Sequence, residues 1–315
     1  MSNNRFSKEV YYDLTILIAT KDRLSQLTKL LISIENSTIL PGTVIIVYHG
    51  TEIESYLKKF NASFDIQIVK SDIASQVFQK QLGLRSLSSN CEWVFFLDDD
   101  VIIESNSIEF LYKKYICNPD FSNYGGFGLA IKNRVYTKHK KLTEYLLYLI
   151  KLHSFSPGDV TKGGHPQLYL NQHDVCDVKW LNGVSIWARK VTNQYFNVPI
   201  ISEYAAYEDV AFSFNVNKNF KLAFACDVFV LDQILESNKP LTSKQFIAGC
   251  YARYCFVDLN PGMSKIWLIA GQIVRNIDFI VRSSNEENYF GRIQLTLKLF
   301  LDLLLLSSGM SKRRY

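Results

Sequence analysis

The residues with the clearest chemical potential are three consecutive carboxylates, Asp98, Asp99 and Asp100. They follow five apolar residues, from Trp93 to Leu97, which predict a strand buried on both faces. Because unpaired charges are too costly to bury inside a strand, the acids must lie at its carboxyl end, where open α/β sheets place their ligands. Oxygen ligands of this kind suit a divalent cation that also binds substrate phosphates. A solvated acidic turn is the alternative interpretation.

A second acidic pair, Glu208-Asp209, stands directly before an apolar pattern of helical spacing that runs to Val216. Carboxylates in the first turn of a helix are stabilised by the positive end of the helix dipole, which also tunes their basicity. Taken alone, the pair is more typical of helix capping than of catalysis.

An alternation of strands and helices must position these acids. Apolar and β-branched stretches predict strands over residues 13–20, 43–48, 64–69 and 93–97, separated by helices over 24–34, 53–60 and 72–88, with a break at Pro41-Gly42. This order is typical of a mostly parallel, helix-covered α/β sheet of the nucleotide-binding type.

The order and spacing of these segments carry a family resemblance. The segments are Leu14 to Ile34, Val44 to Val47, Gln79 to Leu84, and Phe95 to Asp100. Together they resemble the family 2 glycosyltransferases, and the likeness extends over residues 12–235. It implies a GT-A fold, a Rossmann-like mixed sheet flanked by helices that binds nucleotide sugars. Residues 1–235 would form this catalytic domain.

The resemblance also assigns roles on the donor side. The turn after the first strand would hold the nucleotide through Thr20 and Arg23, and Lys80 would face the diphosphate. Asp98 and Asp99 would contact the nucleotide sugar, and Asp98 and Asp100 would bind Mg²⁺ or Mn²⁺. The segment 178–190 resembles the family's glycine-centred strand, in which Gly183 permits a close approach of the sugar. Trp180 is either a stacking surface there or a core residue.

On the acceptor side, the position of Glu208-Asp209, about a hundred residues after the acidic triplet, matches the family's catalytic pair. Asp209 would be the general base and Glu208 a helper or an acceptor ligand. A base opposite the leaving group implies a single displacement with inversion at the anomeric carbon.

Two positions depart from the family pattern. Tyr48, followed by His49-Gly50-Thr51, stands where the family has a base-reading aspartate, so Tyr48 would stack on the nucleotide base. Asp232 stands where many members carry a histidine near the metal, and it is a third candidate metal ligand or a plain turn acid.

Residues 236–315 change in character and predict amphipathic helices. Their apolar runs are interrupted by charges and fall short of the roughly 20 residues that span a bilayer. With the basic segment Lys312-Arg313-Arg314, these helices could contact the inner face of a membrane peripherally. Packing on the catalytic domain, or an interface between copies in a homo-oligomer, explains the pattern equally well.

Composition narrows the possible class of protein, its partners and its cellular compartment. The chain is 48% hydrophobic and 21% charged, which predicts a folded protein. Its net charge of +5, without a basic and aromatic block, suits an anionic substrate and argues against a nucleic-acid partner. Six cysteines without metal-type spacing, and no apolar leader near Met1, predict a cytoplasmic setting. Four histidines are scattered among polar residues, which predicts that they lie on the surface: His139, His153, His165 and His173.

The sequence therefore predicts an inverting, metal-dependent glycosyltransferase. It would move a sugar from a nucleotide-diphosphate donor to a hydroxyl of a glycan or lipid-linked acceptor, in the synthesis of a bacterial capsule, O-antigen or exopolysaccharide. One alternative is an inactive GT-A-like module that scaffolds a membrane glycan-assembly complex. Another is a nucleotidyltransferase, but the turn from Thr20 to Arg23 lacks the glycines of a phosphate-binding loop.

Overall fold

The computed structural model describes most of the chain, with gaps. The described residues are 8–132, 148, 154, 156, 158–167, 176–198, 206–233, 242–282 and 289–307. The basic segment 312–314 and three of the predicted surface histidines (His139, His153 and His173) lie outside these ranges.

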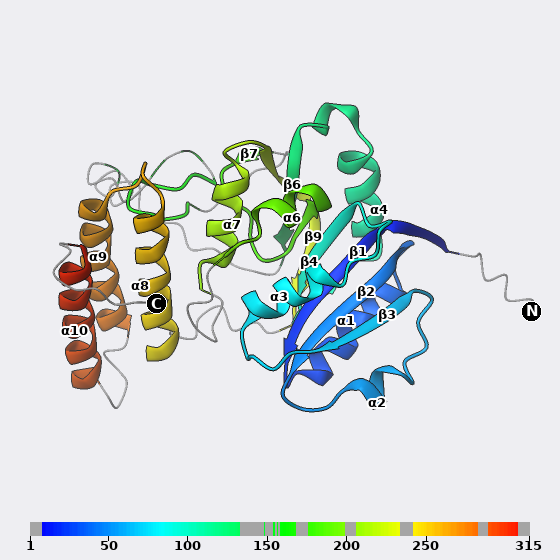
Figure 1. The fold of residues 1–315 in the computed structure, drawn as a ribbon, viewed down its shortest axis with the longest axis horizontal. Coiled ribbons are helices and arrows are strands. Elements are labelled where there is room, and N and C mark those ends of the chain that lie inside the picture. Colours follow the sequence, from blue (N-terminus) through cyan, green and yellow to red (C-terminus); the bar gives the residue numbers. More distant parts are fainter. Residues whose placement is uncertain are drawn as a thin grey trace, which may run out of the picture.

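Nine strands of the described chain form one mixed sheet in the order β3-β2-β1-β4-β8-β6-β9-β5, with β7 also paired to β9 (Figure 1). The strands are β1 Glu9–Lys21, β2 Ile39–His49, β3 Asp65–Lys70, β4 Trp93–Asp98, β5 Val101–Ile103, β6 Tyr124–Ile131, β7 Cys176–Val178, β8 Ser185–Ala188 and β9 Lys221–Asp232. Strands β1 to β4 pair in parallel, whereas β8 runs antiparallel to both β4 and β6. The predicted mixed α/β architecture is confirmed.

Helices cover both faces of this sheet (Figure 1). Their bounds are α1 Leu24–Glu35, α2 Glu54–Leu57, α3 Gln76–Arg85, α4 Ser107–Leu111, α6 Arg189–Tyr195 and α7 Glu208–Val216, with a π-helical turn Tyr112–Ile116 after α4 and a 3-10 turn Pro119–Phe121. Alternation along β1 directs Ile16 and Ile18 into the core under α1 and α4, and Leu17 into the core that contains α3 residues. The 3.6-residue and 2-residue periods of the sequence thus determine which face each element buries.

The parallel register places three strand ends at one edge of the sheet. Ala19 pairs with Val47 on one side and with Asp98 on the other. Consequently Thr20 and the acidic triplet emerge together, at the carboxyl edge where α/β sheets bind ligands.

Two local features differ from the sequence-based expectation. Pro41-Gly42, expected as a break, lies within β2, which is accommodated by a register shift opposite Tyr11 to Thr15. The short strand β5, directly after the acids, was not expected, and it pairs antiparallel with the end of β9.

The C-terminal part is helical, as expected, and consists of α8 Ser243–Leu259, α9 Lys265–Arg282 and α10 Tyr289–Ser307. A capping box starts α8, in which Thr242 and Gln245 each bond the other's backbone N–H. Phe246, Leu268 and Leu303 belong to the same buried cluster as Phe96 of β4, so the three helices pack on the α/β part (Figure 1). In the described ranges, no helix combines the length and apolarity needed to cross a bilayer.

Candidate active site

The acidic triplet is fixed by the turn that follows β1. Thr20 donates its hydroxyl hydrogen to Asp99 Oδ2 over 2.7 Å, and Arg23 Nη1 lies 3.0 Å from both Asp99 Oδ1 and Asp100 Oδ2. Asp99 is buried, and burial raises its pKa, while Thr20 and Arg23 oppose the rise. Asp99 therefore anchors the triplet to the turn, whereas Asp98 and Asp100 are partly exposed.

Asp98 is approached closely by the glycine segment. A Cβ atom on Gly183 would lie 3.1 Å from Asp98 Oδ2, tighter than a side chain tolerates without displacing its neighbour. Gln76, at the start of α3, donates from Nε2 to Asp98 Oδ1 over 3.0 Å. The structure thus brings together Gly183 and Asp98, which are 85 positions apart in the chain.

The second acidic pair begins α7. Tyr207 precedes it in a left-handed conformation with φ of 76°, which turns the chain sharply into the helix. Glu208 is buried and pairs with Lys80 of α3, whose Nζ lies 3.4 Å from Glu208 Oε1. The Lys80 ammonium also lies 5.4 Å from the centre of the Phe96 ring. Lys80 is thereby held at Glu208.

The pKa of Asp209 is shifted by its surroundings. Burial and the neighbouring Glu208 charge raise its pKa to about 7, although the Val210 N–H bond and the Lys80 charge oppose the rise. Asp98 contributes a smaller rise through its charge, which places Asp209 within electrostatic reach of the triplet. A carboxylate with a pKa near neutrality is well matched to accepting a proton at physiological pH.

The residues around Asp100 fit a divalent cation through their donor chemistry. Burial raises the pKa of Asp100, and the charges of Asp98, Asp99 and Asp232 raise it further, against Arg23. Asp232 is close because β5 pairs with β9 and aligns Val101 with Asp232. Within the described ranges, no three His, Cys, Asp or Glu side chains converge in a metal-binding arrangement. The carboxylates around Asp100 offer hard oxygen ligands and destabilise one another's negative charge. Such a group suits a cation that is held by one or two carboxylates together with substrate phosphates.

Two expected donor-site residues lie in the core instead. Tyr48 is 1% exposed, and its hydroxyl donates to Glu52 Oε2 over 2.8 Å, so its ring presents no stacking face in this arrangement. Trp180 is 7% exposed and donates from Nε1 to the Gln167 carbonyl over 2.9 Å. Tyr48 packs in the core cluster that contains Ile18, and Trp180 packs in the other cluster, which contains Phe96. Of the two interpretations of Trp180, the core residue is the one consistent with this burial.

Several contributing residues were not identified from the sequence. Buried Gln79 donates to the carbonyls of Thr20 and Val47, which ties the ends of β1 and β2 together. Asp22, with φ of 55°, accepts from the Thr51 backbone N–H over 2.7 Å. A polar residue on the buried face of a predicted helix, as at Gln79, is the signal that could have revealed the first of these.

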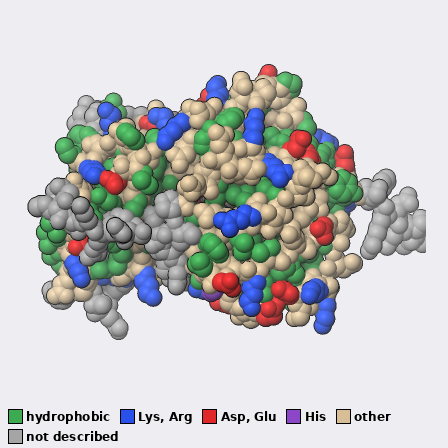
Figure 2. Space-filling model, viewed as in Figure 1, with side chains coloured by type: hydrophobic (Ala, Val, Ile, Leu, Met, Phe, Trp, Pro, Cys, Tyr) green, Lys and Arg blue, Asp and Glu red, His purple; other side chains and the backbone are tan. Residues whose placement is uncertain are grey.

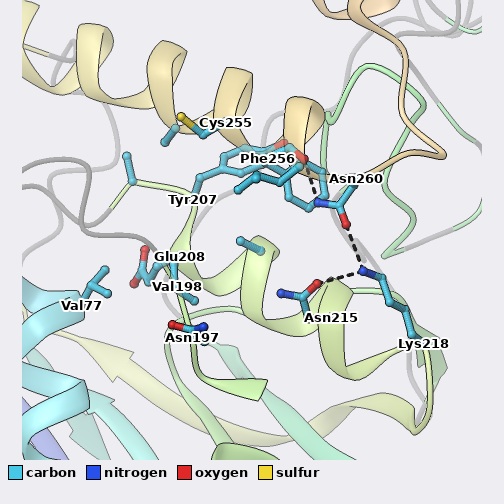
Figure 3. Close-up of a pocket in the computed structure, with 14 residues that line it drawn as sticks. Val77, Asn197, Val198, Tyr207, Glu208, Asn215, Lys218, Cys255, Phe256 and Asn260 are labelled. Atoms are coloured by element: carbon cyan, nitrogen blue, oxygen red, sulfur yellow. Dashed lines mark hydrogen bonds between the residues drawn. The ribbon is translucent and has the colours of Figure 1, made fainter. Parts of the chain in front are cut away.

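A pocket opens beside Glu208, between α7 and α8 (Figure 3). Tyr207 and Phe256 lie together on its α8 side, and the Glu208 carboxylate points toward Val77 of α3. Lys218 bridges Asn215 and Asn260 at the other end, with hydrogen bonds of 3.0 and 3.1 Å. The pocket therefore combines an aromatic wall with amide groups and one cation, which is a suitable surface for a polar ligand such as a sugar.

Comparison with known proteins gives structural matches only. No protein-family description and no curated protein matches the sequence. The fold is similar to that of S. aureus TarS 1-349, with a TM-score of 0.54, 13% identity, and coverage of 92% of this chain and 80% of TarS 1-349. TarS 1-349 in complex with UDP-GlcNAc gives a TM-score of 0.56 at 12% identity, covering 92% and 81%. The mannosyltransferase PcManGT from Pyrobaculum calidifontis, in complex with GDP-Man and Mn²⁺, gives 0.54 at 8% identity, covering 96% and 89%. The chain has the GT-A fold of these proteins.

Proposed function

We propose that the protein is an inverting glycosyltransferase of the family 2 type that uses a nucleotide-sugar donor. The observation that supports this most strongly is that Asp209, whose pKa is raised to about 7, lies within electrostatic reach of Asp98 at the carboxyl edge of a GT-A sheet. The similar structures contain UDP-GlcNAc in one case and GDP-Man with Mn²⁺ in another. A nucleotide sugar at this edge would lie between the two acidic motifs.

On the donor side, we assign the nucleotide to the turn of Thr20 and Arg23 and the sugar to the surface formed by Gly183 and Asp98. Arg23 is about half exposed and already directed at Asp99 and Asp100, so it can also reach an anionic group. Asp99 would act by holding the turn in place. Lys80 would contribute positive potential from its buried position, although its direct partner is Glu208.

On the acceptor side, Asp209 would accept the proton of the acceptor hydroxyl as the new glycosidic bond forms, while the bond to the nucleotide diphosphate breaks on the opposite face of the sugar. This geometry inverts the anomeric carbon. Glu208 lines the pocket of Figure 3, so we place the acceptor there, with its sugar against Tyr207 and its polar groups toward Asn215.

A divalent ion, Mg²⁺ or Mn²⁺, would be held by Asp98 and Asp100, with Asp232 as a weaker third ligand. When bound, such an ion supplies positive charge to the departing diphosphate. Besides burial, repulsion by the neighbouring acids raises the pKa of Asp100, which supports this assignment because a cation would relieve that repulsion.

We further propose that residues 1–235 form the catalytic unit and that residues 236–315 form a helical region at a membrane or an oligomer interface. Exposed apolar side chains on α9 and α10 support this, at Ile266, Ile273, Val274, Ile277, Leu297, Leu301, Leu304 and Leu305. Basic and apolar side chains share this end of the molecule on the face in Figure 2. Contact with an anionic leaflet would place the enzyme near a lipid-linked acceptor of a bacterial capsule, O-antigen or exopolysaccharide.

The test is nucleotide release from a panel of UDP, GDP, dTDP and CMP sugars, with Mn²⁺ or with EDTA. We expect release from one donor class, its loss in EDTA, and its loss in Asp209→Asn while nucleotide-sugar binding persists. Near-normal turnover by Asp209→Asn would refute the assigned base. If no donor binds or turns over, the inactive scaffold becomes the better explanation.

A further inference from the structure

A buried guanidinium to which the described residues offer no carboxylate partner lies next to the proposed active site. Arg253, in the middle of α8, is 3% exposed, and its Nε and Nη1 atoms make no hydrogen bond within the structure. An arginine side chain cannot discharge itself by losing a proton in a protein. An uncompensated buried charge is strongly destabilising. The position of Arg253 therefore calls for an anion.

Two more buried polar groups beside Arg253 also lack hydrogen-bond partners. The Tyr207 ring centre lies 5.2 Å from Arg253 Cζ, and the Tyr207 hydroxyl is buried without a hydrogen bond. His165 Nε2 is likewise buried without a partner, contrary to the expected surface position. The loop that carries His165 contacts Arg253 directly, because a Cβ on Gly164 would lie 3.3 Å from Arg253 Cγ. Three separate elements thus contribute unsatisfied polar groups to the surroundings of Arg253.

The electrostatics of this place favour an acceptor of hydrogen bonds. Burial and the charges of Arg253 and Arg275 lower the pKa of His165 well below its usual value. Burial raises the pKa of the Tyr207 hydroxyl, although the charges of Arg253 and Arg275 oppose the rise, so Tyr207 keeps its proton near neutral pH and can donate it. Guanidinium, phenol and imidazole N–H groups are all donors, and among the described residues no carboxylate forms an ion pair with Arg253. Several donors around one or two positive charges suit an oxyanion.

We propose that Arg253, Tyr207 and His165 form a subsite for a phosphate group of the substrate. A role for this subsite in substrate binding rests on the proposed function, whereas its ability to bind an oxyanion does not. Tyr207 is adjacent in sequence to Glu208, so phosphate binding would occur one residue from the acidic pair. The phosphate would belong either to the donor diphosphate or to a phosphate-bearing acceptor. The C-terminal helices would thereby contribute directly to substrate binding.

The test uses the full-length protein and inorganic phosphate as the probe. We expect phosphate to raise the Tm of the unmodified protein in a concentration-dependent manner. Arg253→Met should weaken phosphate binding by about tenfold or more, since charge-assisted hydrogen bonds are lost. It should also raise the Tm without phosphate, because the unpaired charge is gone. The matched control is Arg85→Met, at an exposed position of α3, which should leave phosphate binding unchanged.

A second variant covers the case in which Arg253→Met does not fold. Tyr207→Phe removes only the unpaired hydroxyl, so it should fold normally and still weaken phosphate binding. The absence of any phosphate effect on the unmodified protein would overturn the proposal. So would a phosphate effect that persists unchanged in Arg253→Met or Tyr207→Phe, since Arg253 would then only support the fold.

Competition with UDP and GDP identifies the source of the phosphate. If the subsite receives the donor diphosphate, the bound nucleotide abolishes the phosphate effect, and Arg253→Met weakens nucleotide binding. If it receives an acceptor phosphate, the nucleotide and phosphate effects add, and nucleotide binding is unchanged in Arg253→Met. The two proposals can fail separately. If the protein binds phosphate through Arg253 but turns over no nucleotide sugar, the proposed glycosyl transfer is wrong and the subsite stands.

Discussion

The buried ion pair between Lys80 and Glu208 permits the most exacting test of this site. The two side chains are 3% and 8% exposed, and they join α3 to the start of α7 across 128 positions of sequence. Lys80→Met keeps the length and packing of the side chain but leaves the Glu208 carboxylate buried without its cation. Removing one partner of a buried pair costs about 3–5 kcal/mol of unfolding free energy. That is a large fraction of the stability of an ordinary domain.

The loss should depend on pH in a defined direction. Burial raises the pKa of Glu208, and Lys80 opposes that rise, so Lys80→Met raises the pKa further. Between the unfolded pKa of glutamate, about 4.3, and the raised folded pKa, the native state binds more protons than the unfolded state. Stability therefore falls as pH rises through this window. The deficit of Lys80→Met should be large at pH 8 and should shrink on acidification toward pH 5.

The assay is urea denaturation at pH 5 and pH 8 for four proteins: the unmodified chain, Lys80→Met, Glu208→Gln and the double variant. We expect the double variant to recover most of the stability lost at pH 8, because no unpaired charge remains. The matched control is Lys58→Met, whose exposed pair with Glu54 should contribute within about 1 kcal/mol. A deficit at pH 8 below about 1 kcal/mol, or one independent of pH, would refute the reasoning about this pair.

Four further predictions concern the acids and their glycine neighbour. Because Asp209 must be ionised to accept a proton and its pKa is raised to about 7, kcat/KM should fall below about pH 7. In Asp209→Asn the free energy of unfolding should exceed that of the unmodified protein at pH 8, and this gain should vanish as pH falls toward 4, which urea denaturation measures. Gly183→Ala should lower turnover by about tenfold or more without loss of fold, since the new Cβ displaces Asp98, and equal rates would contradict that contact. Asp99→Asn should chiefly lower Tm, because Asp99 anchors Arg23. Asp98→Asn should chiefly abolish the Mn²⁺ dependence of nucleotide release. The reverse pattern would contradict these roles.

Local sequence patterns determined most of the secondary structure. The continuous apolar and β-branched run of β1 and the 3.6-residue spacing of α1 specify surfaces that any stable packing must cover. The apolar run ending at Asp98 likewise required the acids to lie at a strand end. These conclusions needed no long-range information, because each follows from the energetic cost of exposing apolar groups or of burying charge.

Side-chain partners, in contrast, were decided by the tertiary structure. The pairing of β5 with β9 brings Asp232 near Asp100. The packing of α3 places Lys80 within ion-pair distance of Glu208. Tyr48 illustrates the same limit, because a one-residue difference in position along a strand decides whether a ring faces the core or a ligand.

The sequence by itself determined that acids stand at a sheet edge and at a helix start in a GT-A-like order. Only the tertiary structure decided that the pKa of Asp209 rises to about 7, that Gly183 lies where a Cβ would crowd Asp98, and that Arg253 is buried with two nitrogen atoms lacking hydrogen bonds. The physical reason is that periodicity records which face of an element is apolar, whereas burial and charge proximity depend on elements distant in sequence that pack against it.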